Sequence, residues 1–281
     1  ILKSYKDWEE SPQGKQLNFK EIEEFKKIYF WEYIHRMIGR LLGLVFIIPF
    51  IYFLVKKKLN RKLIYQSLVL FSMGAMQGGI GWWMVKSGLV KNPDVSHFRL
   101  AIHLTTAFLT CAFTLWVALP LIYRDKREGN KKLLKLTSWL FILVIIQIIY
   151  GAFVAGLNAG KICNTWPKMC GEWIPDSIFM INPFWENFVT NHYGIQFIHR
   201  TLAFIIVAFV FYIWNKGRKL QQNYLQRKSL NILLSLVILQ TVIGIFTLIL
   251  MVPISLALIH QLGAFLLLMS VVFSLFTFSK S

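Results

Sequence analysis

The segment Glu32-Tyr33-Ile34-His35-Arg36-Met37-Ile38 leads into an apolar run, LLGLVFIIPFIYFLV, at residues 41–55. Together with the residues just before it, this run is long enough for a helix to cross a hydrocarbon core of about 30 Å. An acid, an imidazole and a guanidinium are costly at the start of a membrane helix, so such residues are functional candidates by default. This one stretch therefore predicts both a fold class and a site.

The rest of the chain has the same character. Hydrophobic residues make up 56% of the 281 residues, which is too apolar for a soluble globular protein. The segments of about ten residues with alternating polarity that a membrane barrel needs are missing. We predict an all-α membrane protein with seven transmembrane helices, at approximately 30–55, 63–85, 98–123, 134–157, 193–214, 230–251 and 254–278.

The distribution of positive charge predicts the orientation of these helices. The formal net charge is +18, and sixteen of the 31 Lys and Arg residues lie in the loops 56–62, 124–135 and 216–228. These loops are two helices apart, as the positive-inside rule expects of inner loops. The amino terminus of this chain is therefore expected outside and the carboxyl terminus inside. The same pattern argues against nucleic acid as a partner.

An internal repeat refines the organisation. Three helices of the first half match three of the second in order, and one such pair shares His35-Arg36 and His199-Arg200. The helix at 134–157 has no counterpart, so we expect the last seven helices of an eight-helix pseudo-twofold repeat of four-helix bundles. The predicted parts are an outer-face segment at 1–29, an N-terminal half bundle at 30–123, an inner basic loop at 124–133 and a C-terminal half bundle at 134–281.

Four histidines, His35, His103, His199 and His260, are each alone on an apolar helix and close to its outer end. Imidazole is a common axial ligand of haem iron, and bundles hold cofactors between facing helices. With the repeat, this predicts two bis-histidine haem sites, one in each half. For any single histidine, the alternative is a hydrogen-bonded contact between helices.

Arginines beside these histidines suit the propionates of a haem. Arg36 and Arg200 each follow a histidine directly, and a guanidinium binds a carboxylate through two parallel hydrogen bonds. Arg40 and Arg99 lie nearby, and extension towards lipid headgroups is the simpler explanation for those two.

The two copies differ at one position. Glu32 lies one turn before His35, whereas Gln196 stands at the matching position before His199. A carboxylate there could hold water, move protons or stabilise positive charge, or it could serve only as a partner for arginine. Because Arg200 persists where the acid is replaced, the difference favours one reactive site, with Glu32 as its catalytic residue, and one site that only transfers electrons.

Longer motifs resemble those of the haem A synthase family, in particular its alphaproteobacterial and mitochondrial branch. In order along the chain they are EYIHRMIGR at 32–40, QGGIGWWMVKSGL at 77–89, RLAIHL at 99–104, GAFVAGLNAGKICNTWP at 151–167, QFIHR at 196–200 and HQLGA at 260–264. They extend over nearly the whole chain. The family has eight membrane helices, and the apparent lack of the first one here matches the expectation from the repeat.

The resemblance implies a membrane oxidoreductase that oxidises the C8 methyl of haem O to a formyl group, giving haem A for cytochrome oxidase. By analogy, His35 and His103 would flank the iron of the substrate haem, and Glu32 would be the catalytic acid. His199 and His260 would ligate a resident haem b that relays electrons. The implied membrane is a bacterial plasma membrane or the mitochondrial inner membrane.

The family also bears on the cysteines and the partners. Other members have a disulfide in the outer loop where Cys163 and Cys170 flank Trp166-Pro167, and the spacing permits a bridge without requiring one. Cys111 lies within a helix and is expected to be buried. The implied partners are the lipid bilayer, haem O, the haem O synthase and an electron donor or acceptor that the sequence does not identify. A homo-oligomer is compatible with this reading.

A di-haem b-type electron-transfer cytochrome is the alternative function. Such cytochromes often stack two histidines on one helix, so that two haems lie across the bilayer. Here each helix carries one candidate ligand and all four are predicted near the outer face, which disfavours electron transfer across the membrane. A haem transporter or chaperone, a third possibility, would need neither Glu32 nor two bis-histidine sites.

Overall fold

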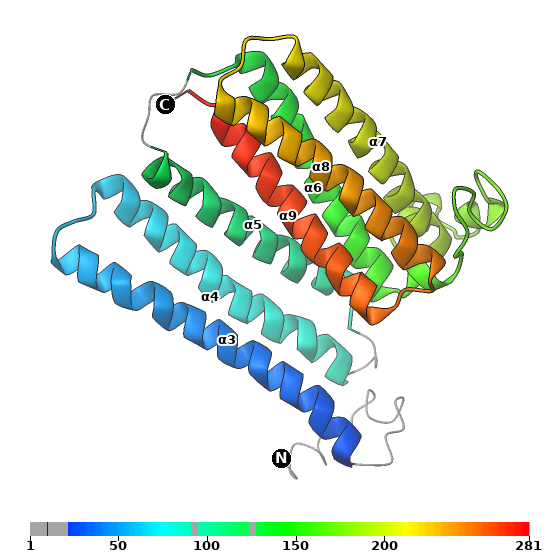
Figure 1. Ribbon diagram of the computed structural model, residues 1–281. Coiled ribbons are helices and arrows are strands. Elements are labelled where there is room, and N and C mark those ends of the chain that lie inside the picture. Colours follow the sequence, from blue (N-terminus) through cyan, green and yellow to red (C-terminus); the bar gives the residue numbers. More distant parts are fainter. Residues whose placement is uncertain (1–9, 11–21, 91–94, 124–127, 281) are drawn as a thin grey trace. The chain divides into compact units, whose positions relative to one another are not determined.

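Seven long helices make up most of the described chain. The computed structural model describes residue 10 and residues 22–90, 95–123 and 128–280. In these ranges the helices are α3 (Ile22–Val55), α4 (Arg61–Val90), α5 (His97–Ile122), α6 (Lys131–Gly156), α7 (His192–Arg218), α8 (Tyr224–Ile249) and α9 (Ile254–Phe278) (Figure 1). Each contains a span long and apolar enough to cross a membrane. The prediction of an all-α integral membrane protein with seven such helices is confirmed.

The helix ends differ from the predicted ones where polar residues set the boundary. α8 begins at Tyr224 rather than near 230, because Asn223 caps it. The Asn223 side chain accepts a hydrogen bond from the Gln226 amide at 2.9 Å, and the Gln226 side chain accepts one from the Asn223 amide at 3.3 Å. At the other end of the chain, α3 is continuous from Ile22, so it begins within the predicted segment 1–29 rather than near residue 30.

The chain divides into two compact units, Ile1–Thr110 and Cys111–Ser281, and the boundary falls within α5. In the first unit α3 packs on α4, with the Phe46 and Phe71 rings 6.3 Å apart. Cys111 is exposed, so the expectation that it is buried is wrong. A small apolar side chain in a helix does not by itself specify which helix face it occupies. Most of the predicted outer-face segment 1–29, and residues 124–127 of the predicted inner loop, lie outside the described residues.

The second unit contains a four-helix bundle of α6, α7, α8 and α9 (Figure 1). Each helix packs on two neighbours: α6 on α7 and α9, and α8 on the same two helices. This arrangement places α7 and α9 diagonally across the bundle. Candidate ligands on these two helices can therefore approach one cofactor from opposite sides.

The packing of this bundle differs between its two ends. All buried residues of α9 lie in its second half, from Leu267 to Phe278. In α7, the buried apolar residues after the His-Arg pair begin at Ile206 and continue at Val210 and Ile213. Such residues fill the end far from the histidines with close-packed aliphatic and aromatic side chains. His199 and His260 themselves are partly exposed, unlike the fully buried residues at that far end.

Candidate functional site

His199 and His260 lie at the same level of the bundle, on the diagonal helices α7 and α9. Each is about two turns inside its helix, which begins at His192 for α7 and at Ile254 for α9. The two imidazoles are within electrostatic range of each other. The structure thus brings together the pair that the sequence predicts for the resident haem.

The rings of these histidines have unsatisfied hydrogen-bonding capacity. The Nδ1 atoms of His199 and His260 are buried and have no partner among the described residues, and the same holds for Nδ1 of His103. Leaving a buried polar atom unpaired costs free energy, so native structures rarely do so without a functional reason. The alternative interpretation, a hydrogen bond between helices through the imidazole, is not what the structure contains at these three positions.

Two glutamines that were not predicted as site residues from the sequence bind the backbone of these two histidines. Gln147 of α6 donates from Nε2 to the carbonyl oxygen of His199 at 3.0 Å. Gln240 of α8 donates in the same way to the carbonyl oxygen of His260 at 2.9 Å. Both bonds join neighbouring helices at the level of the histidines, and they fix the height of each histidine relative to the adjacent helix.

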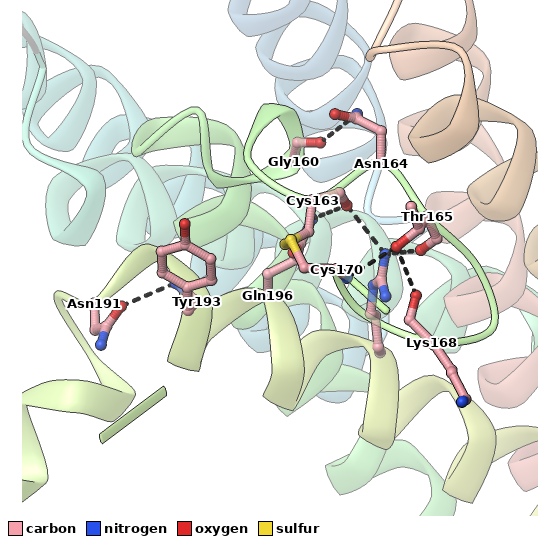
Figure 2. The surroundings of a disulfide bond; sticks show 10 residues. Gly160, Cys163, Asn164, Thr165, Lys168, Cys170, Asn191, Tyr193 and Gln196 are labelled. Carbon is pink, nitrogen blue, oxygen red and sulfur yellow. Dashed lines mark hydrogen bonds between the residues drawn. A yellow bond between two sulfur atoms is a disulfide. The ribbon is translucent and has the colours of Figure 1, made fainter. Parts of the chain in front are cut away.

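The loop between α6 and α7 carries a disulfide between Cys163 and Cys170 (Figure 2). Arg200 is hydrogen-bonded to this loop. Its Nη2 donates to the carbonyl oxygens of Cys163 at 3.2 Å and Thr165 at 2.7 Å. Its Nε and Nη1 atoms are buried and have no partner among the described residues. Two donor groups of the guanidinium are therefore unused, and either can donate a charge-assisted hydrogen bond to a carboxylate.

Gln196 binds the same loop. It is almost fully buried, at 2% exposure, and donates from Nε2 to the carbonyl oxygen of Cys163 at 3.1 Å. Arg200 donates to that same oxygen. An ionised glutamate at position 196 could not donate, and it would attract Arg200 away from the loop. The structure therefore gives a physical reason for the amide at this position.

Two buried asparagines hold the loop between α6 and α7 in place. Asn187 accepts from the Ile181 amide at 2.8 Å and donates to the carbonyl oxygens of Ile181 and Phe184. Asn191 donates to the carbonyl oxygen of Ser177 at 2.9 Å and also caps α7, accepting from the Tyr193 amide at 2.9 Å. Asn191 thus connects the first turn of α7, the helix that carries His199, to the loop that precedes it.

Glu32 and Arg36 form an ion pair in the first unit. The Nη1–Oε2 distance is 3.0 Å, and the side chains are 45% exposed for Arg36 and 51% for Glu32. The Arg36 guanidinium also lies 5.9 Å from the centre of the Tyr29 ring. Arg36 is therefore engaged by an acid on its own helix, whereas its counterpart Arg200 is engaged by backbone carbonyls.

His35 and His103 are the histidine pair of the first unit and lie within electrostatic range of each other. His103 is half-buried two turns inside α5, and His35 is exposed at the same depth of a span that begins at Tyr29. Nearby, Arg99 donates to the carbonyl oxygen of Trp83 at 2.7 Å and lies over the Trp83 ring, so this arginine has partners on α4.

The donor set in the second unit fits a haem. Imidazoles from opposite helices can supply both axial ligands, and Arg200 offers its unpaired Nε and Nη1 to a propionate. The first unit repeats the imidazole pair and adds a carboxylate, Glu32. One unit therefore has the parts to hold a haem, and the other has a similar set with an added group that can transfer a proton.

Comparison with known proteins agrees with this chemistry. The model of the cytochrome oxidase assembly protein family COX15-CtaA matches residues 1–272. A protein named "Heme A synthase" from Flavobacterium johnsoniae is 45% identical over 284 residues, which cover 99% of this chain and 83% of that protein. Proteins of the same name from Flavobacterium psychrophilum (46% identity; 97% of this chain, 84% of that protein) and Nitrosospira multiformis (43%; 94% and 78%) are also similar. The chain belongs to the COX15-CtaA family of cytochrome oxidase assembly proteins.

Proposed function

We propose that this chain is a haem A synthase, an enzyme that acts on haem O. The relatives quoted above carry that name and are similar over nearly the whole chain. The observation that supports the proposal most directly is that only one of the two matching positions carries an acid. Glu32 stands one turn before His35, and Gln196 stands at the same position before His199. A carrier of electrons alone has no need of this difference, so the di-haem cytochrome is not favoured.

The first unit is the proposed substrate site. His35 and His103 would hold haem O from its two faces, and Arg36 would bind a propionate. Oxidation of the C8 methyl to a formyl group exchanges C–H bonds for a C=O bond. Electrons must therefore pass to the electron acceptor proposed below, an oxygen atom must be supplied, and protons must leave the substrate. Glu32, one turn from His35 and half-exposed, can accept such a proton or hold the water that does.

The second unit is the proposed electron-transfer site. His199 and His260 would ligate a resident haem b, which supplies one-electron redox chemistry when bound. Arg200 would bind a propionate through its unpaired Nε or Nη1, while the carbonyls of Cys163 and Thr165 hold Nη2. The absence of an acid here agrees with a site where no proton has to be moved.

The proposed function also implies a division of the chain into halves, an orientation in the membrane and a set of partners. We propose that 30–123 and 134–281 are the two functional halves, with the amino terminus of this chain outside and the carboxyl terminus inside. A disulfide in the loop before α7 is compatible with an oxidising outer face. A periplasmic reporter enzyme fused after Ser281 would be active if this orientation were wrong. The proposed partners are the haem O synthase and an electron donor or acceptor, and a homo-oligomer is compatible with the proposal. The relatives quoted above are bacterial proteins.

Analysis of the bound haem tests the function. We expect the purified protein to contain haem b together with haem O, its hydroxylated form or haem A, separable by chromatography and identified by mass. Addition of haem O should increase the amount of haem A or of the hydroxylated form. A protein that holds only haem b, and that leaves added haem O unchanged under any redox condition, would be an electron carrier instead.

Replacement of Gln196 tests the second site. Gln196→Glu should lose the hydrogen bond to Cys163 and draw Arg200 from the loop, so the haem b content and the thermal midpoint should both fall. An unsatisfied buried group costs about 1–3 kcal/mol. The comparison variant Gln196→Leu removes the same hydrogen bond without adding charge, and we expect it to be less severe. Equal effects of the two variants would mean that Arg200 is not displaced by an acid at this position.

A further inference from the structure

Three helices carry a glutamine followed four residues later by a glycine. The pairs are Gln77 and Gly81 on α4, Gln147 and Gly151 on α6, and Gln240 and Gly244 on α8. In each case the next helix along the chain carries a candidate ligand, namely His103, His199 or His260. We propose that each Gln-x-x-x-Gly pair is the positioning element for the haem ligand on the following helix, a role that rests on the haem chemistry proposed above.

The glycine provides the space in which the imidazole lies. A Cβ atom on Gly244 would stand 2.7 Å from Cε1 of His260, closer than non-bonded carbon atoms approach. On Gly151 it would stand 3.2 Å from Cε1 of His199, and on Gly81 it would stand 3.2 Å from Cε1 of His103. Any larger residue would therefore have to move the imidazole, most of all at Gly244.

The glutamine fixes the residue that bears the imidazole. Because Gln147 and Gln240 bond to the backbone carbonyls of His199 and His260, they set the height of each ligand without occupying a ring nitrogen. The other amide atom, Oε1, is buried and unpaired in both glutamines, as is Nδ1 of both imidazoles. An imidazole that binds iron through Nε2 needs an acceptor for its Nδ1–H. The glutamine already bonded to that residue has a free oxygen to offer.

The pair in the first unit works through an intermediate group. Gln77 donates to the hydroxyl of Thr106 at 2.5 Å, and this hydroxyl donates to the carbonyl oxygens of Ile102 at 2.6 Å and His103 at 3.2 Å. His103 is thus held one step less directly than His199 and His260. A direct hydrogen bond to the histidine backbone suits a resident haem. A hydrogen bond relayed through Thr106 suits a substrate haem that must enter and leave.

Alanine substitutions in the purified, haem-loaded protein test the glycines. We expect the low-spin haem b signal in electron paramagnetic resonance to be lost in Gly244→Ala, and to shift with partial loss in Gly151→Ala. Gly79→Ala is the matched control, because a Cβ there meets nothing within 4 Å. Alanine is the better helix former by about 1 kcal/mol, so helix propensity cannot explain a loss.

Substitutions of Gln240 test the hydrogen bond and keep the proposal testable if Gly244→Ala fails to fold. Gln240→Leu should weaken haem b retention by roughly 10- to 100-fold, as outer partners of ligating histidines do, and should move the midpoint potential. Gln240→Glu, which can donate when protonated, should recover part of both. Wild-type spectra, retention and potential in Gly151→Ala and Gln240→Leu would overturn the positioning role. A wild-type protein that binds no haem would instead overturn the proposed function, on which the positioning role rests.

Discussion

The Glu32→Gln variant is expected to keep both haem sites and to convert haem O roughly 100- to 10,000-fold more slowly, the usual contribution of a general acid or base. Glutamine keeps the shape of the side chain but cannot accept a proton. The matching position before His199 already carries Gln196, so an amide is tolerated one turn from a candidate ligand. The measurement is the rate of haem O consumption, followed by chromatography, with haem b content measured on the same sample.

A second variant separates the carboxylate from its ion pair. Glu32 and Arg36 are about half-exposed, and such a pair contributes at most about 1 kcal/mol, so breaking it should not unfold the protein. Arg36→Gln breaks the same pair and leaves the carboxylate in place. We expect a higher KM for haem O, because a propionate contact is lost, with a much smaller fall in kcat. Equal losses of kcat in both variants would mean that Glu32 acts only through Arg36, and wild-type turnover in Glu32→Gln would exclude a catalytic role.

The membrane helices could be predicted from the sequence because a single physical requirement, an apolar span of sufficient length, determines them. The span predicted at 254–278 is α9 to the residue, and the one at 98–123 differs from α5 by one residue at each end. Errors arose where the helix continues past the apolar run into polar residues. α7 extends to Arg218, and α8 starts at the cap formed by Asn223, because backbone hydrogen bonds and caps, rather than hydropathy, end a helix in water.

The histidine pairs could be predicted because the repeat places equivalent residues at equivalent depths. The hydrogen bonds around them could not, because they depend on which helices become neighbours. Gln147 lies on the helix that the repeat left unmatched, and only the packing of α6 on α7 directs its amide to the carbonyl oxygen of His199. The hydrogen bonds that hold Arg200 likewise depend on the path of the 35-residue connection between α6 and α7. One feature of these contacts could have been recognised from the sequence alone. The same four-residue spacing from glutamine to glycine occurs at 77–81, 147–151 and 240–244.

Removal of either proposed ligand of the second unit is expected to abolish the low-spin spectrum of the proposed haem b. A six-coordinate haem with two imidazoles needs both, and one remaining ligand leaves a high-spin or readily lost haem. His199→Ala and His260→Ala should therefore each lose the sharp bands of the reduced spectrum. Conversion of haem O should stop with them, because electrons would no longer reach or leave the substrate site. His192→Ala, which removes an imidazole at the first residue of α7, should keep the wild-type spectrum.

Added imidazole separates loss of a ligand from loss of the fold. The hydrogen bonds from Gln147 and Gln240 go to backbone carbonyls, which alanine retains, so the helices should stay joined in both variants. Free imidazole can then occupy the space left by the missing side chain and restore a low-spin spectrum, rising with its concentration. Restoration in His199→Ala and His260→Ala, with no effect on the wild-type protein, would assign both residues as axial ligands. A low-spin spectrum that persists in both variants without added imidazole would place the haem b on other residues.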